Sequence, residues 1–155
     1  MKEMLMDWIG MHKCVQMWFQ SAHHCTKGTG FAGDHDLLYG DIYQKFFADF
    51  DVIVEKSIGI CDDESVSCPL HLCKCCMKHV NNYPSPCNKD ATYIAAHALA
   101  IMKDYIKYLT ATYNTLKASG DLTLGTDDLI MSLANEYESY VYKLQQRVKS
   151  TVGVK

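Results

Sequence analysis

The stretch that decides the fold runs from His23 to Glu55 and reads HHCTKGTGFAGDHDLLYGDIYQKFFADFDVIVE. Residues 26–33 contain three glycines and no apolar periodicity, which indicates a loop that ends one helix. In the helical pattern that follows, Asp51 and Glu55 are four residues apart and therefore share a helix face. The stretch predicts a corner between two helices, and the two imidazoles of His23 and His35 and the two carboxylates are all expected near that corner.

Imidazole and carboxylate ligands together suit iron, manganese or zinc. Two carboxylates at this spacing are also common on an ordinary solvated helix surface. Spacing alone therefore leaves two interpretations open, a metal site and a plain surface. The candidate metal ligands are His23, His35, Asp51 and Glu55.

Outside this stretch, apolar residues recur at three- and four-residue spacing in residues 3–24, 35–58 and 90–118, and again after Thr126. Residues 59–89 lack this pattern and form a long crossover, in which Pro69–Val80 is predicted to be a short helix that begins with proline. We therefore predict an all-α chain, a ferritin-like four-helix bundle with the crossover between its second and third helices. At 155 residues, the chain is expected to form a single domain.

Individual side chains fit the ends and the interior of these helices. Asp34 is expected to cap the second helix by accepting backbone N–H bonds, and Asp90 or Thr92 to cap the third. Ser119-Gly120 is expected to end the third helix. His12 lies in the middle of the apolar stripe of the first helix and is interpreted as a buried structural residue.

The crossover contains six of the eight cysteines. Its thiols and imidazoles suit a structural zinc site, although the spacing is not a paired C-x2-C pattern. Bound zinc, unbound thiols and disulfide or redox pairing all stay open. The candidate zinc ligands are Cys68, His71, Cys73, Cys75, Cys76 and His79.

Composition excludes several classes of protein. A formal net charge of −3 and a pI near 6.1 argue against a general nucleic-acid binder, so DNA is not an expected partner. The longest uncharged runs are about twelve residues, too short to cross a bilayer. Without a recognisable secretory signal, the chain is expected to be soluble and cytoplasmic.

The corner also resembles the signature of the Dps family, the mini-ferritins, and the resemblance extends over roughly residues 4–150. It implies a two-fold dimer, assembled into a shell of twelve subunits, in which the histidines of one subunit face the carboxylates of its mate. It also implies ferroxidase activity, with Fe(II) oxidised by peroxide or oxygen and ferric iron stored in the shell, a function in oxidative stress. The matching positions are His23, Lys27, Gly28, Phe31, His35, Asp51 and Glu55.

The chain departs from the family pattern at several positions. Tyr39 stands where the family has an aspartate ligand, and His24 stands where it has tryptophan. The interval from His35 to Asp51 is one residue longer than usual, so a frame set by Asp51 places Asp36 in the position of the second histidine. These departures favour an alternative function, a non-enzymatic ferritin-like binding or interaction module stabilised by zinc in the crossover.

Overall fold

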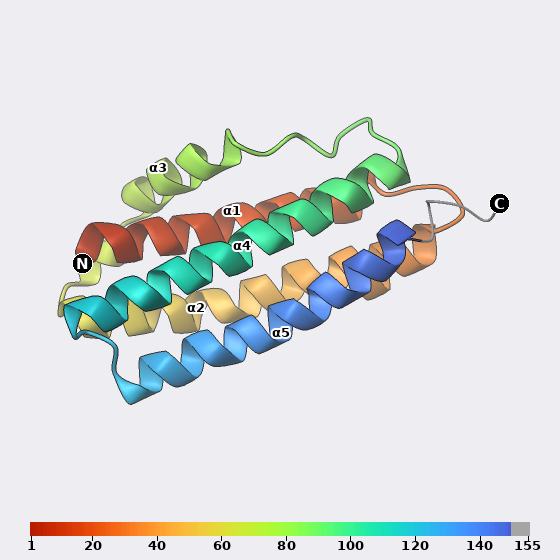
Figure 1. Ribbon diagram of the computed structural model, residues 1–155. Helices are drawn as coiled ribbons and strands as arrows, with labels where there is room; N and C mark the ends of the chain where they lie inside the picture. The colour runs from red at the N-terminus through yellow and green to blue at the C-terminus, as the bar shows by residue number, and fades with distance from the viewer. Residues whose placement is uncertain (150–155) are drawn as a thin grey trace.

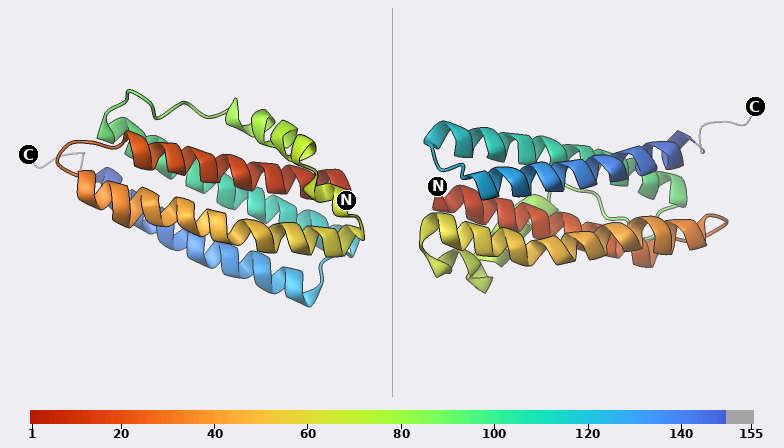
Figure 2. Two further views of the ribbon diagram at one scale, coloured as in Figure 1. Left: turned by 180° about the vertical axis from the view of Figure 1, so that it is seen from behind. Right: turned by 90° about the horizontal axis from the view of Figure 1, so that it is seen from below.

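A computed structural model describes residues 1–149 and shows four long helices side by side, with a shorter helix outside them (Figure 1). The crossover returns along the whole length of the bundle, so α2 and α4 run in the same direction (Figures 1 and 2). The elements are α1 (Lys2–Cys25), the π-helix η1 (Gly33–Gly40), α2 (Asp41–Cys61), the 3-10 helix η2 (Glu64–Ser67), α3 (Pro69–Val80), α4 (Ala91–Ser119) and α5 (Leu124–Lys149). The predicted all-α bundle, with a long crossover that contains a short helix, is confirmed.

The ends of α4 follow from local chemistry. The side chain of Asp90 accepts a hydrogen bond of 2.8 Å from the backbone N–H of Tyr93, which confirms the predicted N-cap. At the other end, Gly120 has a φ of 80°, a left-handed conformation that glycine adopts at low cost. Leu116 and Lys117 offer their carbonyl oxygens to the Gly120 N–H, so α4 ends at the predicted residues.

The second helix differs from the prediction. Its first part, η1, is π-helical, and the regular α-helix begins only at Asp41. A π-helix closes its hydrogen bonds between residues five apart instead of four, so it accommodates an extra residue without a break. This π-helical segment lies within the interval from His35 to Asp51, which the resemblance indicated to be one residue longer than usual. The predicted cap was wrong, since η1 has Ala32 at its N-cap position and no side-chain cap bond.

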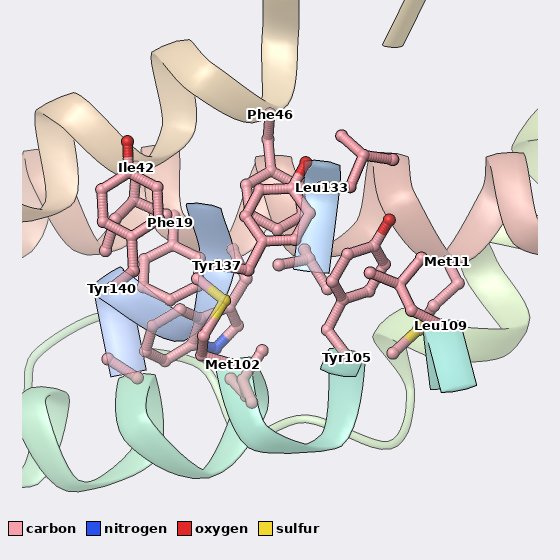
Figure 3. Packing of buried hydrophobic residues seen from close by; sticks show 14 of the residues in the cluster. Met11, Phe19, Ile42, Phe46, Met102, Tyr105, Leu109, Leu133, Tyr137 and Tyr140 are labelled. Atoms are coloured by element: carbon pink, nitrogen blue, oxygen red, sulfur yellow. The ribbon is translucent and has the colours of Figure 1, made fainter. Parts of the chain in front are cut away.

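Aromatic rings fill the centre of the bundle (Figure 3). The Phe46 and Tyr137 rings are stacked with their centroids 4.4 Å apart, and Tyr105 meets both. His12 is fully buried among them, with Nδ1 bonded to the Tyr105 hydroxyl and Nε2 2.7 Å from the Phe46 carbonyl oxygen. His12 is thus a structural residue, as predicted, because both ring nitrogens already have partners inside the core.

The crossover packs along the outside of α1. Gly10 is required at the contact with α3, because a Cβ there would overlap Cys75. Further along, the Trp18 indole N–H donates a 2.8 Å hydrogen bond to the carbonyl oxygen of Pro84. The other tryptophan, Trp8, lies on the core side of α1, with its indole nitrogen 3.3 Å from the Tyr105 hydroxyl.

Within residues 1–149, no helix combines the length and apolar character needed to span a membrane.

Candidate functional site

His23 and His35 come together at the corner between α1 and η1. Their ring centroids are 3.6 Å apart, and Nδ1 of His23 lies 2.7 Å from the backbone carbonyl oxygen of His35. A carbonyl oxygen can only accept, so Nδ1 of His23 carries the proton and Nε2 is left with a free lone pair. This is the arrangement that orients a metal-binding imidazole.

His35 has an equivalent arrangement. Its Nδ1 lies 2.6 Å from a carboxylate oxygen of Asp36, which leaves Nε2 as the unprotonated nitrogen of the neutral ring. The His35 ring contacts those of both His23 and Phe31, and its side chain is 27% exposed. Two imidazole rings, each with its Nδ1 bonded to an oxygen atom, are therefore held side by side where solvent reaches them.

Gly40 makes this packing possible. A Cβ at this position would lie 2.6 Å from the carbonyl oxygen of His35 and 3.2 Å from Nδ1 of His23. Any larger residue would therefore push the imidazole away from the carbonyl group that orients it. The glycine that closes η1 is thus part of the architecture of the histidine pair.

A partly buried ion pair holds the first turn of η1. Arg147, near the end of α5, donates two hydrogen bonds of 2.7 and 2.8 Å to the two carboxylate oxygens of Asp34. Asp34 is 3% exposed, and its carboxylate raises the pKa of Arg147 above its usual value. Such a bidentate pair restricts orientation as well as distance, so it joins the corner to the far end of the chain.

The two predicted carboxylate ligands lie elsewhere. Asp51 and Glu55 are exposed on α2, and neither makes an ion pair or a side-chain hydrogen bond within residues 1–149. Sixteen residues separate Asp51 from His35, which corresponds to about 24 Å along a helix. One chain therefore cannot bring these carboxylates and the histidine pair to the same ion. Accordingly, the described part of the chain has no cluster of three or more His, Cys, Asp or Glu side chains suited to a metal.

Tyr39, which stands where the Dps pattern has aspartate, points into the protein. Its side chain is fully buried beside Phe19, and its hydroxyl has no hydrogen-bond partner in the structure. Burial raises the pKa of Tyr39 well above its usual value, so the phenol stays protonated. Tyr39 therefore supplies no ligand to the exposed face of the histidine pair.

The predicted zinc ligands of the crossover do not converge. Cys76 is buried against α1, with its sulfur 3.8 Å from that of Met17, whereas His71 and Cys73 are exposed. His79 is directed toward α1 instead, with Nε2 3.1 Å from the Asp7 carboxylate. No three of the proposed ligands, all within the described chain, surround one point, so the zinc alternative has no support. These residues are Cys68, His71, Cys73, Cys75, Cys76 and His79.

Sequence reasoning missed three contributions to the corner. Nothing in the sequence around Arg147 or Asp34 indicates that the two pair, because 113 residues separate them. The hydrogen bond between Asp36 and His35 joins adjacent residues. An aspartate directly after a histidine could therefore have indicated this bond from the sequence. Cys25 was not placed beside any other thiol, yet its sulfur lies 3.5 Å from that of Cys87.

Comparison with known proteins supports the fold. No protein-family model matches the chain, and no curated protein matches it. Among solved structures, the chain is similar to a Mycobacterium smegmatis Dps in its tetragonal form, with a TM-score of 0.72 and 14% sequence identity. The similarity covers 92% of this chain and 82% of that one. The chain therefore has the ferritin-like fold of a Dps protein.

Proposed function

We propose that the protein is a Dps-like iron protein. It binds Fe(II) between the subunits of a two-fold dimer, oxidises it with peroxide or oxygen, and stores ferric iron in an oligomeric shell. One observation carries this proposal: His23 and His35 lie together with both Nδ1 atoms bonded to oxygen, so that both Nε2 atoms remain for a metal ion.

The surface of α2 supports assembly with a second copy of the chain. Phe47, Asp51 and Glu55 follow one another at four-residue intervals and so form one row along α2. Phe47 is 65% exposed and the neighbouring Val52 is 41% exposed. Exposed apolar side chains around two unpaired carboxylates suit burial against another subunit. In a two-fold interface, the row on one subunit would meet the histidine pair of its mate.

The donor set suits iron as a substrate. His23 and His35 contribute neutral nitrogen, and Asp51 and Glu55 contribute two negative charges that balance Fe(II) and favour the more highly charged Fe(III). Because Tyr39 is withdrawn into the core, the site has no further protein oxygen at that position. The remaining coordination positions are then open to peroxide or oxygen.

Substitution of the carboxylates tests the site. We expect Asp51→Asn and Glu55→Gln each to slow Fe(II) oxidation about 10-fold or more, measured by ferric absorbance after peroxide is added to anaerobic protein. Asp128→Asn is the matched control, because it removes an exposed carboxylate from α5 and should not change the rate. Size-exclusion chromatography checks that each variant assembles. Unchanged oxidation in both α2 variants would refute the assignment.

Mixed assemblies test whether two subunits share the site. A His23→Asn/His35→Asn chain and an Asp51→Asn/Glu55→Gln chain should each be inactive alone. In a dimer of the two, one site receives both intact histidines from one chain and both intact carboxylates from the other. Random co-assembly should therefore restore about a quarter of the wild-type activity, since half the dimers are mixed and each has one complete site. No restoration would exclude a shared site.

A further inference from the structure

We infer that Cys25 and Cys87 form a peroxide-sensitive dithiol, which is oxidised to a disulfide between the end of α1 and the crossover. This reaction needs no iron and consumes peroxide directly. It is therefore independent of the proposed ferroxidase site, and its test can be carried out with that site inactive.

The two sulfur atoms already touch. Cys25 is the last residue of α1, Cys87 lies in the segment between α3 and α4, and their Sγ atoms are 3.5 Å apart. All eight cysteines in the described chain are free thiols. A disulfide needs a sulfur–sulfur distance of about 2.05 Å, so the sulfurs must approach by about 1.5 Å. Residues 81–90 are not helical and are mostly exposed, so this segment can make the adjustment.

The surroundings of Cys87 identify it as the thiol that reacts first. Cys87 is exposed, whereas Cys25 is half-buried. Hydrogen bonding to Ser85, and then the bond that Cys25 donates, lower the pKa of Cys87 below its usual value. The thiolate is the nucleophilic form of cysteine, so Cys87 is the better nucleophile toward peroxide. Cys25 is then in place to complete the reaction.

The chemistry balances in two steps. The Cys87 thiolate attacks one oxygen of hydrogen peroxide, the O–O bond breaks, and the departing hydroxide takes a proton to become water. The sulfur of Cys25 then loses its proton and attacks the sulfenic sulfur of Cys87. An S–S bond forms, the S–O bond breaks, and the second hydroxide leaves as water after protonation. Two thiols and one peroxide thus give one disulfide and two waters.

The disulfide would join parts of the chain that are 62 residues apart. Closing so large a loop restricts the unfolded chain, so the oxidised protein should melt at a higher temperature than the reduced protein. The bond between Trp18 and Pro84 already holds the crossover against α1 three residues before Cys87. The covalent link would therefore secure an existing contact and leave the course of the chain unchanged.

The test uses the full chain, freed of iron and kept in a chelator, with one equivalent of hydrogen peroxide. We expect the thiol count to fall from eight to six, with loss of two hydrogens from the intact mass. Peptide mapping should identify the Cys25–Cys87 link, and a thiol reductant should reverse it. In the Cys25→Ser variant, a sulfenic acid at Cys87 should be trapped by dimedone, whereas Cys87→Ser should not yield a corresponding adduct at Cys25.

Cys73→Ser is the matched control, since it removes another exposed thiol and should leave the Cys25–Cys87 disulfide unchanged. Oxidation of a different cysteine pair, cross-linking between chains through Cys87, or no loss of thiols would each overturn the inference. Because iron is absent throughout, none of these outcomes bears on the ferroxidase proposal.

Discussion

The Nδ1 atom of His23 is bonded to the backbone carbonyl oxygen of His35 at 2.7 Å, so the last turn of α1 is attached directly to the π-helix that follows the loop. The orientation of one imidazole thus depends on the backbone geometry of the segment that carries the other. Gly40 lies against both groups, with no room for a side chain. Changes in η1 should therefore affect the histidine pair even when neither histidine is altered.

Gly40→Ala tests this dependence. The added Cβ would overlap the carbonyl group of His35, and we expect a loss of about 1–3 kcal/mol in the free energy of unfolding, as for other overpacked sites. Displacement of His23 should also weaken Fe(II) binding. Chemical denaturation and Fe(II) titration measure the two effects.

Gly59→Ala is the control for this change. Gly59 lies in α2 with nothing within 4 Å of the added Cβ. Alanine there should stabilise the helix by about 0.5–1 kcal/mol and leave Fe(II) binding unchanged. Equal effects of the two substitutions would show that Gly40 has no special role.

The ion pair between Asp34 and Arg147 should contribute strongly to stability. Arg147→Met leaves the buried Asp34 carboxylate without its partner, and we expect a loss of about 3 kcal/mol in urea denaturation. Lys143→Met breaks an ion pair with Asp41 in which both side chains are about half exposed, so its cost should stay below about 1 kcal/mol. Similar losses in the two variants would contradict a structural role for the buried pair.

His12 should make stability depend on pH. Burial lowers its pKa to about 4, although the nearby Asp49 carboxylate acts in the opposite direction. Between pH 6.5 and 4 the unfolded chain binds a proton at His12 that the folded chain does not, so stability rises with pH in this window. From pH 7 to pH 5 the folded state should lose about 2 kcal/mol through this group.

Urea denaturation at pH 7 and pH 5 measures this loss in wild type and in His12→Gln. The variant is expected to be less stable at both values, because it disturbs the core, but its dependence on pH should be smaller by about 2 kcal/mol. His71→Gln removes an exposed imidazole and is the control. A pH dependence identical in wild type and His12→Gln would exclude His12 as its origin.

Assembly should depend on the exposed face of α2. Phe47→Glu places a charge where the proposed dimer would bury an aromatic ring, so light scattering should detect smaller species than in wild type. Met131→Glu alters a similarly exposed apolar residue on α5 and should leave the dimer intact. A Phe47→Glu protein of wild-type size would place the two-fold contact elsewhere.

The helices could be predicted from the sequence because their information is local. Apolar periodicity predicted α1 and α4 to within one residue at each end, whereas α5 begins at Leu124, three residues earlier than predicted. The predicted Asp90 cap and Gly120 stop both occur. Asp34 does not cap the helix, and the reason cannot be inferred from the local sequence. Its carboxylate is bound by Arg147, which only tertiary folding brings to the first turn of η1.

The site was harder to predict than the fold. The rings of His23 and His35 lie together, whereas Asp51 and Glu55, which were expected near the same corner, lie further along α2. The resemblance indicated a longer interval between His35 and Asp51, but a count of residues does not reveal a π-helix. Likewise, Tyr39 could be recognised as a replaced ligand, whereas its burial depends on the packing around Phe19.

The positions of the two tryptophans allow the crossover and the bundle to be observed separately by intrinsic fluorescence. The fluorescence of Trp8 reports on the aromatic core, because its indole contacts Tyr105. The fluorescence of Trp18 reports on the crossover, because its indole is bonded to Pro84. A Trp8→Phe protein would therefore emit only from the indole that reports the crossover. Its emission should shift when the crossover detaches from α1, even if circular dichroism still records an intact bundle. Fluorescence of single-tryptophan variants can thus show whether the crossover opens before the helices unfold.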